Sequence, residues 1–117
     1  MQQTIFHAKS SSGDGYDVTF TVKGSRLTAF CTCPAGIHRK LCKHVLGLLG
    51  GDKRVLSDPA EAQQLADFTA VARRSSFSEF ARKLYEQEKR VTEEQTRLGR
   101  IKRDFTRALK AGLPLEE

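Results

Sequence analysis

Residues 31–44 read C-T-C-P-A-G-I-H-R-K-L-C-K-H and contain all three cysteines of the chain. The stretch begins with Cys31 and Cys33 and ends with Cys42 and His44, so two donors stand at each end of a short loop. Sulfur and imidazole donors of this kind are the ligands of structural, tetrahedral Zn²⁺ sites. The spacing C-x-C-x8-C-x-H therefore predicts one closed zinc site, with Zn²⁺ as the cofactor.

The spacing also predicts local structure. In an extended segment, residues two apart point to the same side, so Cys31 and Cys33 can face one ion from the end of a strand. On a helix, residues two apart are separated by about 200°. We therefore expect Cys42 in the turn before a helix and His44 in its first turn. The apolar run after His44 indicates that this helix continues to the glycine pair at 50–51.

The same residues resemble a SWIM-type zinc finger, which has Cys-x-Cys, a variable gap and then Cys-x-His. The resemblance covers about residues 16–51 and does not reach the C-terminal half. It implies that Cys31, Cys33, Cys42 and His44 are zinc ligands. It also implies that the segment binds DNA or protein, and that the motif is not an active site.

Other interpretations of the cysteines stay open. Three cysteines cannot all pair, and a disulfide between residues two apart is strained, but a structural disulfide is one alternative. Buried free thiols beside a chance histidine are another. His38, inside the loop, is a possible substitute ligand, although it breaks the paired spacing. His7 lies far upstream and is expected to be a strand or surface residue.

Hydrophobic alternation before the loop predicts an antiparallel β-meander. We expect strands at residues 4–9, 16–22 and 27–31, the last of which delivers Cys31, and a turn at 34–36. Residues 1–56 are thus predicted to form the zinc finger domain. The fold class is α+β: a small β-meander and helix of SWIM-like type, followed by a helical region with one long, coiled-coil-like helix.

The helical region is expected over residues 57–117, with a short helix at 58–73 and a long helix at 77–111. Apolar residues recur at seven-residue intervals along the long helix, although Gln87 and Glu94 interrupt the second row of the heptad. Such a helix can fold back on the short one, pair with a second copy as a homodimer, or dock on another protein. The regular row consists of Phe77, Leu84, Val91, Leu98 and Phe105.

The chain is basic, with a net charge of +6 and a pI near 9.5. Basic residues surround the predicted zinc loop, where they either balance a centre with three thiolates or contact phosphates. The end of the long helix has a basic face, which suits phosphates, an anionic membrane surface or an acidic protein groove. Candidate nucleic-acid contacts are Lys23, Arg26, Arg39, Lys40, Lys43, Arg100, Arg103 and Arg107.

The finger shows no aromatic platform for stacking bases, apart from Tyr16, so nucleic-acid binding is expected to depend on the phosphate backbone. The motifs of zinc deaminases, zinc proteases and P-loop enzymes do not occur, and four protein ligands would leave no open position on the metal. We therefore expect no enzyme. The cysteines and the absence of a signal pattern or a membrane span indicate an intracellular protein, cytoplasmic or, in a eukaryote, nuclear.

Two functions follow from these features. The first is a non-catalytic zinc-finger module that binds nucleic acid, DNA rather than RNA. The second is a protein–protein interaction adaptor, which docks on a larger complex through the finger or the C-terminal amphipathic helix. An accessory subunit that targets a larger enzyme is a further possibility. Because the core is small, we expect the N-terminal half to need its metal to fold.

Overall fold

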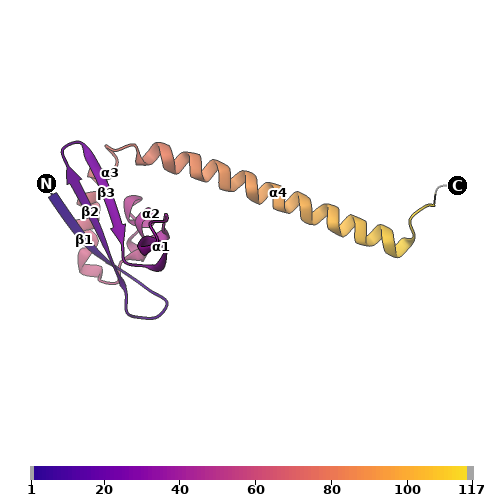
Figure 1. The fold of residues 1–117 in the computed structure, drawn as a ribbon, viewed down its shortest axis with the longest axis horizontal. Coiled ribbons are helices and arrows are strands. Elements are labelled where there is room, and N and C mark those ends of the chain that lie inside the picture. The colour runs from indigo at the N-terminus through magenta and orange to yellow at the C-terminus, as the bar shows by residue number, and fades with distance from the viewer. Residues whose placement is uncertain (1, 116–117) are drawn as a thin grey trace. The chain divides into compact units, whose positions relative to one another are not determined.

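The computed structural model describes residues 2–115 and has an α+β fold (Figure 1). Residues 1, 116 and 117, which belong to the ends of the two predicted regions, lie outside the described range. The predicted fold class is confirmed: a three-stranded antiparallel sheet precedes the helices. The elements are β1 (Gln2–Ala8), β2 (Tyr16–Lys23), β3 (Arg26–Cys31), α1 (Pro34–Ile37), α2 (Lys43–Leu49), η1 (Lys53–Val55), η2 (Pro59–Glu61), α3 (Ala62–Ala72) and α4 (Phe77–Ala111).

The sheet has the strand order β1-β2-β3, with both pairs antiparallel. Val18 on β2 is the register partner of Phe6 on β1 and of Cys31 on β3, and all three side chains are buried. Alternate residues of β2 face the core, as the period of two in its sequence predicts. The two-residue turn between β2 and β3 has Gly24 at a φ of 61°, a conformation that favours glycine.

The chain returns to the outer edge of β1 after α2. The N–H of Lys9 donates to the carbonyl of Val55, and the N–H of Ser57 donates to the carbonyl of His7. The distance between nitrogen and oxygen is 2.9 Å in each bond. Between them, Ala8 and Leu56 form an antiparallel bridge. Residues 55–57 therefore cover the C-terminal end of β1.

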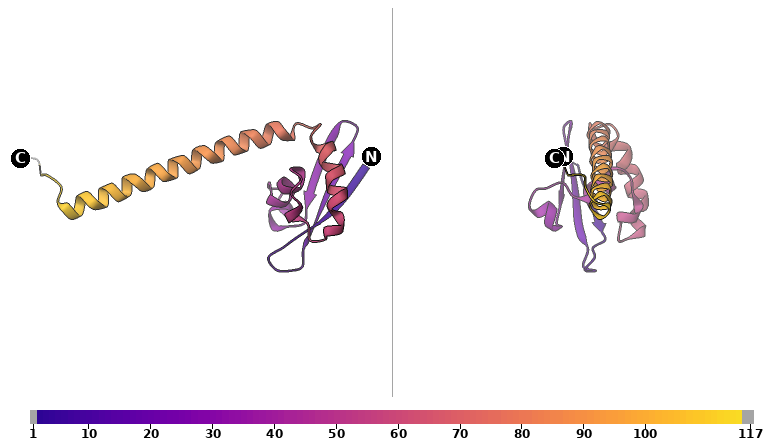
Figure 2. Two further views of the ribbon diagram at one scale, coloured as in Figure 1. Left: turned by 180° about the vertical axis from the view of Figure 1, so that it is seen from behind. Right: turned by 90° about the vertical axis from the view of Figure 1, so that its right-hand side faces the viewer.

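One face of the sheet carries the hydrophobic core, and α3 packs on it (Figure 2). The ring of Phe68 on α3 stacks on Phe20 with centroids 4.3 Å apart and meets Phe6 edge-on at 5.7 Å. Leu48 from α2 and Leu65 from α3 complete this core. The described residues up to Ser78 form one compact unit.

The ends of the helices differ in detail from the predicted ones. Asp58 accepts the N–H of Ala60 as expected of a capping residue, but residues 59–61 form a 3₁₀ turn and the α-helix starts at Ala62. At the start of the long helix, the N–H of Phe77 donates to the hydroxyl of Ser75.

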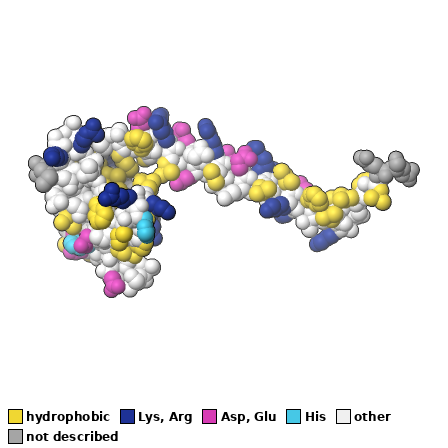
Figure 3. Space-filling model, viewed as in Figure 1, with side chains coloured by type: hydrophobic (Ala, Val, Ile, Leu, Met, Phe, Trp, Pro, Cys, Tyr) yellow, Lys and Arg dark blue, Asp and Glu magenta, His cyan; other side chains and the backbone are white. Residues whose placement is uncertain are grey.

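The second compact unit begins at Glu79 and consists mainly of α4, whose bounds agree with the predicted 77–111. The helix is continuous through Gly99. Large apolar side chains stay exposed along it, especially on its distal half (Figure 3). Within the described residues, no helix combines the length and the apolar character that a bilayer crossing needs.

Candidate metal centre

Three element ends bring the four predicted ligands together. Cys31 is the last residue of β3, Cys33 is the N-cap of α1, and Cys42 is the N-cap of α2. His44 follows in the first turn of α2, as the helical geometry predicts. The predicted turn at 34–36 is a single helical turn, α1, which reverses the chain between the two pairs.

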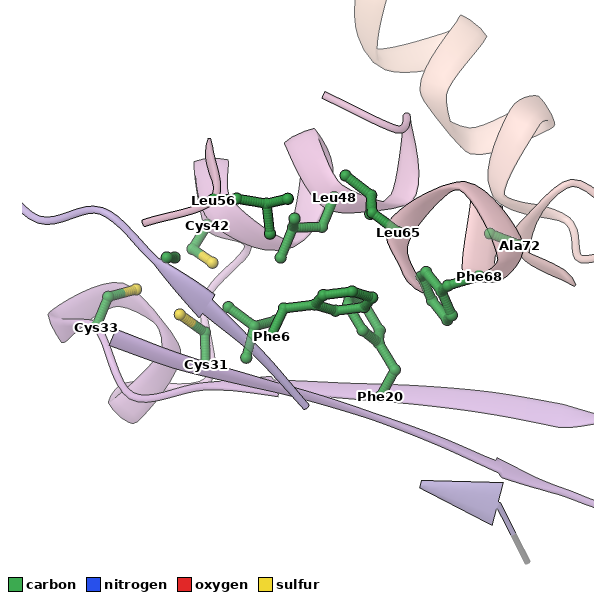
Figure 4. Packing of buried hydrophobic residues seen from close by; sticks show 12 residues of the cluster. Phe6, Phe20, Cys31, Cys33, Cys42, Leu48, Leu56, Leu65, Phe68 and Ala72 are labelled. Carbon is green, nitrogen blue, oxygen red and sulfur yellow. The ribbon is translucent and has the colours of Figure 1, made fainter. Parts of the chain in front are cut away.

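The four donor atoms lie close enough to share one ion. They all lie within 4.8 Å of one another, and Sγ of Cys31 is 3.8 Å from Nδ1 of His44. In a tetrahedral zinc site, two sulfurs that are each about 2.3 Å from the metal lie about 3.8 Å apart. Figure 4 shows the sulfur atoms of Cys31, Cys33 and Cys42 turned toward a common point. The side chains are positioned to hold a metal ion.

Backbone N–H groups support two of the sulfurs. The N–H of Gly36 donates to Sγ of Cys33, and the N–H of Val45 donates to Sγ of Cys42. The distance between nitrogen and sulfur is 3.3 Å in each bond. Each donor lies three residues after its sulfur, at the N-terminal end of a helix, where N–H groups have no partner within the helix. A thiolate accepts such bonds more strongly than a thiol does, so the hydrogen bond from Gly36 favours a deprotonated Cys33.

Burial and hydrogen bonds shift the pKa values of three of the four donors. Burial raises the pKa of the Cys31 thiol to about 12. Burial also acts to raise the pKa of Cys33, but hydrogen bonds, first among them that from Gly36, bring this pKa below its ordinary value. Burial, aided by the charge of Lys43, lowers the pKa of His44, which keeps its imidazole neutral. Buried sulfurs that must all become anions need a bound cation to compensate them.

The structure shows no disulfide among the three cysteines and leaves His38 and His7 outside the cluster of donors. All three cysteines are free, so no disulfide forms among them. His38 caps the end of α1 with its side chain exposed and does not belong to the cluster. His7 is exposed on β1, as expected, where its Nδ1 lies 2.7 Å from a carboxylate oxygen of Glu61.

The structure separates the predicted phosphate contacts into groups. Lys23 and Arg26 are register partners at the turn between β2 and β3. Arg39, Lys40 and Lys43 lie near the other end of β3, about 17 Å away along a strand of this length. Arg100, Arg103 and Arg107 lie on α4, in the second unit.

One residue beside the cluster was not predicted as a site residue. Phe30, next to Cys31 on β3, is half exposed. The signal was present, because the side chains of a strand alternate and a buried Cys31 places Phe30 on the other side. Tyr16, the aromatic residue that the sequence did single out, instead packs on His44 with ring centroids 5.2 Å apart.

The position of the four donors agrees with a comparison against protein families. Residues 16–50 match the SWIM zinc finger. The resemblance predicted from the residues is therefore confirmed for β2, β3, α1 and α2, which we call the SWIM segment. The match leaves α3 and α4 outside. Comparisons with curated proteins and with solved structures found no match.

Proposed function

We propose that the chain is a non-catalytic module that binds nucleic acid through the phosphate backbone of DNA, and that Zn²⁺ holds its SWIM segment together. The observation that carries this proposal is the position of the basic loop. Arg39 and Lys40 lie between two pairs of buried donors, with their own side chains exposed. A metal bound at both ends of the loop would fix these cations in space, which reduces the entropy lost when they bind phosphates.

Zinc is the metal that the donor set suits best. Three sulfurs and one imidazole occur together in tetrahedral zinc sites, whereas magnesium and calcium prefer oxygen ligands. Four protein ligands fill a tetrahedron and leave no position for a substrate or an activated water. We therefore assign the metal a structural role. Native mass spectrometry of freshly purified, reduced protein tests this assignment, with one zinc per chain as the expected result.

Charge supports a polyanionic partner for the SWIM segment. The chain has a net charge of +6. Among the described residues, Arg39, Lys40 and Lys43 form no ion pair, so their charges are available to a ligand. Binding led by phosphate contacts is sensitive to salt and weakly selective for sequence, because phosphates carry no sequence information.

The test is a salt titration of binding to labelled, non-specific DNA, followed by fluorescence anisotropy. We expect the logarithm of the association constant to fall linearly with the logarithm of the salt concentration. Arg39→Glu combined with Lys40→Glu should abolish binding while zinc stays in place. Arg73→Glu combined with Arg74→Glu, which makes the same charge change at the exposed end of α3, should retain most of it.

A second function rests on a different observation, the exposed apolar row of α4. Val91, Leu98 and Phe105 follow one another at seven-residue intervals and are about half exposed. A row of this kind is typical of a helix that packs on another helix. Under this alternative the chain is an adaptor or accessory subunit, which docks on a larger complex or pairs with a second copy. Absence of DNA binding at low salt would favour the adaptor.

A further inference from the structure

An open hollow of about 520 Å³ lies at the free edge of β3, and two of the four proposed metal ligands, Cys31 and Cys42, are among its lining residues. Apolar walls come from Phe30 on β3, from Leu41 in the basic loop and from Val45 on α2. Arg39 and Lys40 also line it, and its lining residues include no carboxylate. The hollow therefore has apolar walls and a positively charged rim, which Arg39 and Lys40 form.

Phe30 gives the hollow an aromatic surface that solvent can reach. Phe30 is 51% exposed, and it lies on the face of the sheet opposite to the buried Cys31. Tyr16 is partly covered by its contact with His44. The expectation that the finger exposes no aromatic residue beyond Tyr16 is therefore wrong, and Phe30 is the candidate for contact with a base.

Backbone hydrogen bonds to α1 position the two cations of the rim, Arg39 and Lys40. Arg39 has a φ of 57°, in the left-handed region that few residues other than glycine adopt. Its N–H donates to the carbonyl of Gly36, and the N–H of Lys40 donates to the carbonyl of Ala35. Lys and Arg side chains and hydrophobic side chains lie next to one another on this part of the finger (Figure 3). The rim is thus tied to α1 by its backbone.

We infer that this hollow binds a nucleotide of single-stranded nucleic acid, with the base against Phe30 and the flanking phosphates at Arg39 and Lys40. The inference rests on the proposed function and narrows it to unpaired strands. An aromatic ring accepts the face of any base, and neighbouring cations track the backbone. In a duplex the bases are stacked on one another, so no base would contact the apolar walls of the hollow. An aliphatic, acidic peptide would match the charge but would not need an exposed aromatic ring.

The metal centre and the hollow are formed by neighbouring residues of the same segments. Phe30 directly precedes Cys31, and Leu41 directly precedes Cys42, so two apolar residues that line the hollow are each next to a metal ligand. A bound metal would therefore set the width of the hollow. Loss of the metal should remove single-strand binding together with the fold of the SWIM segment.

The experiment compares two labelled probes with the full zinc-loaded chain: an oligothymidylate about twelve nucleotides long and a duplex of the same length. The critical variant is Phe30→Thr, because threonine suits a strand and its hydroxyl tolerates solvent. Ile5→Thr is the matched control. Ile5 is 44% exposed and, like Phe30, is a register partner of Thr19, so it lies on the same face of the sheet but away from the hollow.

We expect the single strand to bind more tightly than the duplex. Phe30→Thr should weaken single-strand binding by at least about fivefold, without changing its salt dependence, because stacking involves no charge. Ile5→Thr should leave it unchanged. Arg39→Gly keeps a backbone conformation that glycine accepts, and it should reduce the slope of the salt dependence by about 0.7. Native mass spectrometry confirms that each variant retains its zinc.

The outcomes that would overturn the inference are distinct from failure of the proposed function. If the duplex binds as well as the single strand and Phe30→Thr changes neither, the inference is wrong but nucleic-acid binding stands. If neither probe binds at low salt, both fail. If Phe30→Thr instead weakens binding of a peptide rich in glutamate and leucine, and no oligonucleotide binds, the hollow is a docking site for an acidic protein.

Discussion

A Cβ atom on Gly36 would lie 2.0 Å from the backbone oxygen of Cys31. This distance is far shorter than any real Cβ contact, and the obstructing atom belongs to the backbone of β3. The helical turn α1 therefore lies directly against the end of the strand, at the point where Cys31 meets the other donors. Glycine is required here because any side chain would clash with β3. Its φ is not in the left-handed region, so backbone conformation is not the reason.

Gly36→Ala should therefore disrupt the metal centre. The added methyl group can be accommodated only if α1 moves away from β3, which separates Cys33 from Cys31. We expect a loss of about 3 kcal/mol or more in the free energy of unfolding of the zinc-loaded protein, measured by urea denaturation. Gly50→Ala is the control, because a Cβ there is in ordinary contact at 3.5 Å. Wild-type stability and zinc content in Gly36→Ala would contradict this account.

Removal of the metal should unfold the first compact unit. Structural zinc sites contribute about 10–16 kcal/mol of apparent binding free energy, and small domains are stable by only about 5–15 kcal/mol in total. We expect a strong chelator to abolish cooperative thermal unfolding and the sheet signal in circular dichroism, and added zinc to restore both. Cys42→Ser should behave like the chelated protein. Unchanged circular dichroism after complete zinc removal would refute the dependence.

The contact between His7 and Glu61 should make stability depend on pH. A hydrogen bond with Glu61, followed by its charge, raises the pKa of His7 above its ordinary value. The stabilisation is therefore complete below the unfolded-state pKa of about 6.5 and is lost as pH rises through the raised folded-state pKa. Because His7 is exposed, the effect is small, and solvent screens it.

Glu61→Gln provides the measurement for this pair. The difference in melting temperature between wild type and variant should be larger at about pH 6 than at about pH 9. Comparing the two proteins at each pH cancels the contribution of the metal ligands, which both share. A difference that is constant across this range, or that grows toward alkaline pH, would show that the pair is not linked to folding in this way.

The exposed row on α4 should make the chain self-associate. At tens of micromolar protein, we expect a dimer in sedimentation velocity, because the row buries apolar surface only against a partner helix. Leu98→Glu places a charge in the row and should restore the monomer. Thr96→Glu adds the same charge at an exposed position of α4 outside the row, and it should leave the dimer intact. A wild-type monomer at this concentration would rule out pairing through α4.

The sequence predicted those parts of the structure that follow from local geometry. The spacing of Cys42 and His44 cannot be accommodated inside a helix, so the start of α2 at Lys43 was predictable. The strands were predictable because polar and apolar residues alternate along β2. The exposure of Phe30 follows from the same alternation once Cys31 is taken as buried.

Contacts between distant segments were not predictable in this way. Phe68 stacks on Phe20 across 48 positions of the chain, and nothing near either residue specifies the pairing. The contact of Glu61 with His7 spans 54 positions, and it depends on how residues 55–57 cross the end of β1. A sequence pattern indicates which face of an element is buried, but not which of several apolar helices covers it.

The coverage of β1 by residues 55–57 has a consequence for aggregation. A fibril grows by adding strand to strand, so each molecule must offer two open edges. Here one edge is closed at its C-terminal end by Val55, Leu56 and Ser57, while β3 forms the other. Two copies that met through β3 would leave only this partly covered edge outside, which hinders edge-to-edge growth of the sheet beyond a pair.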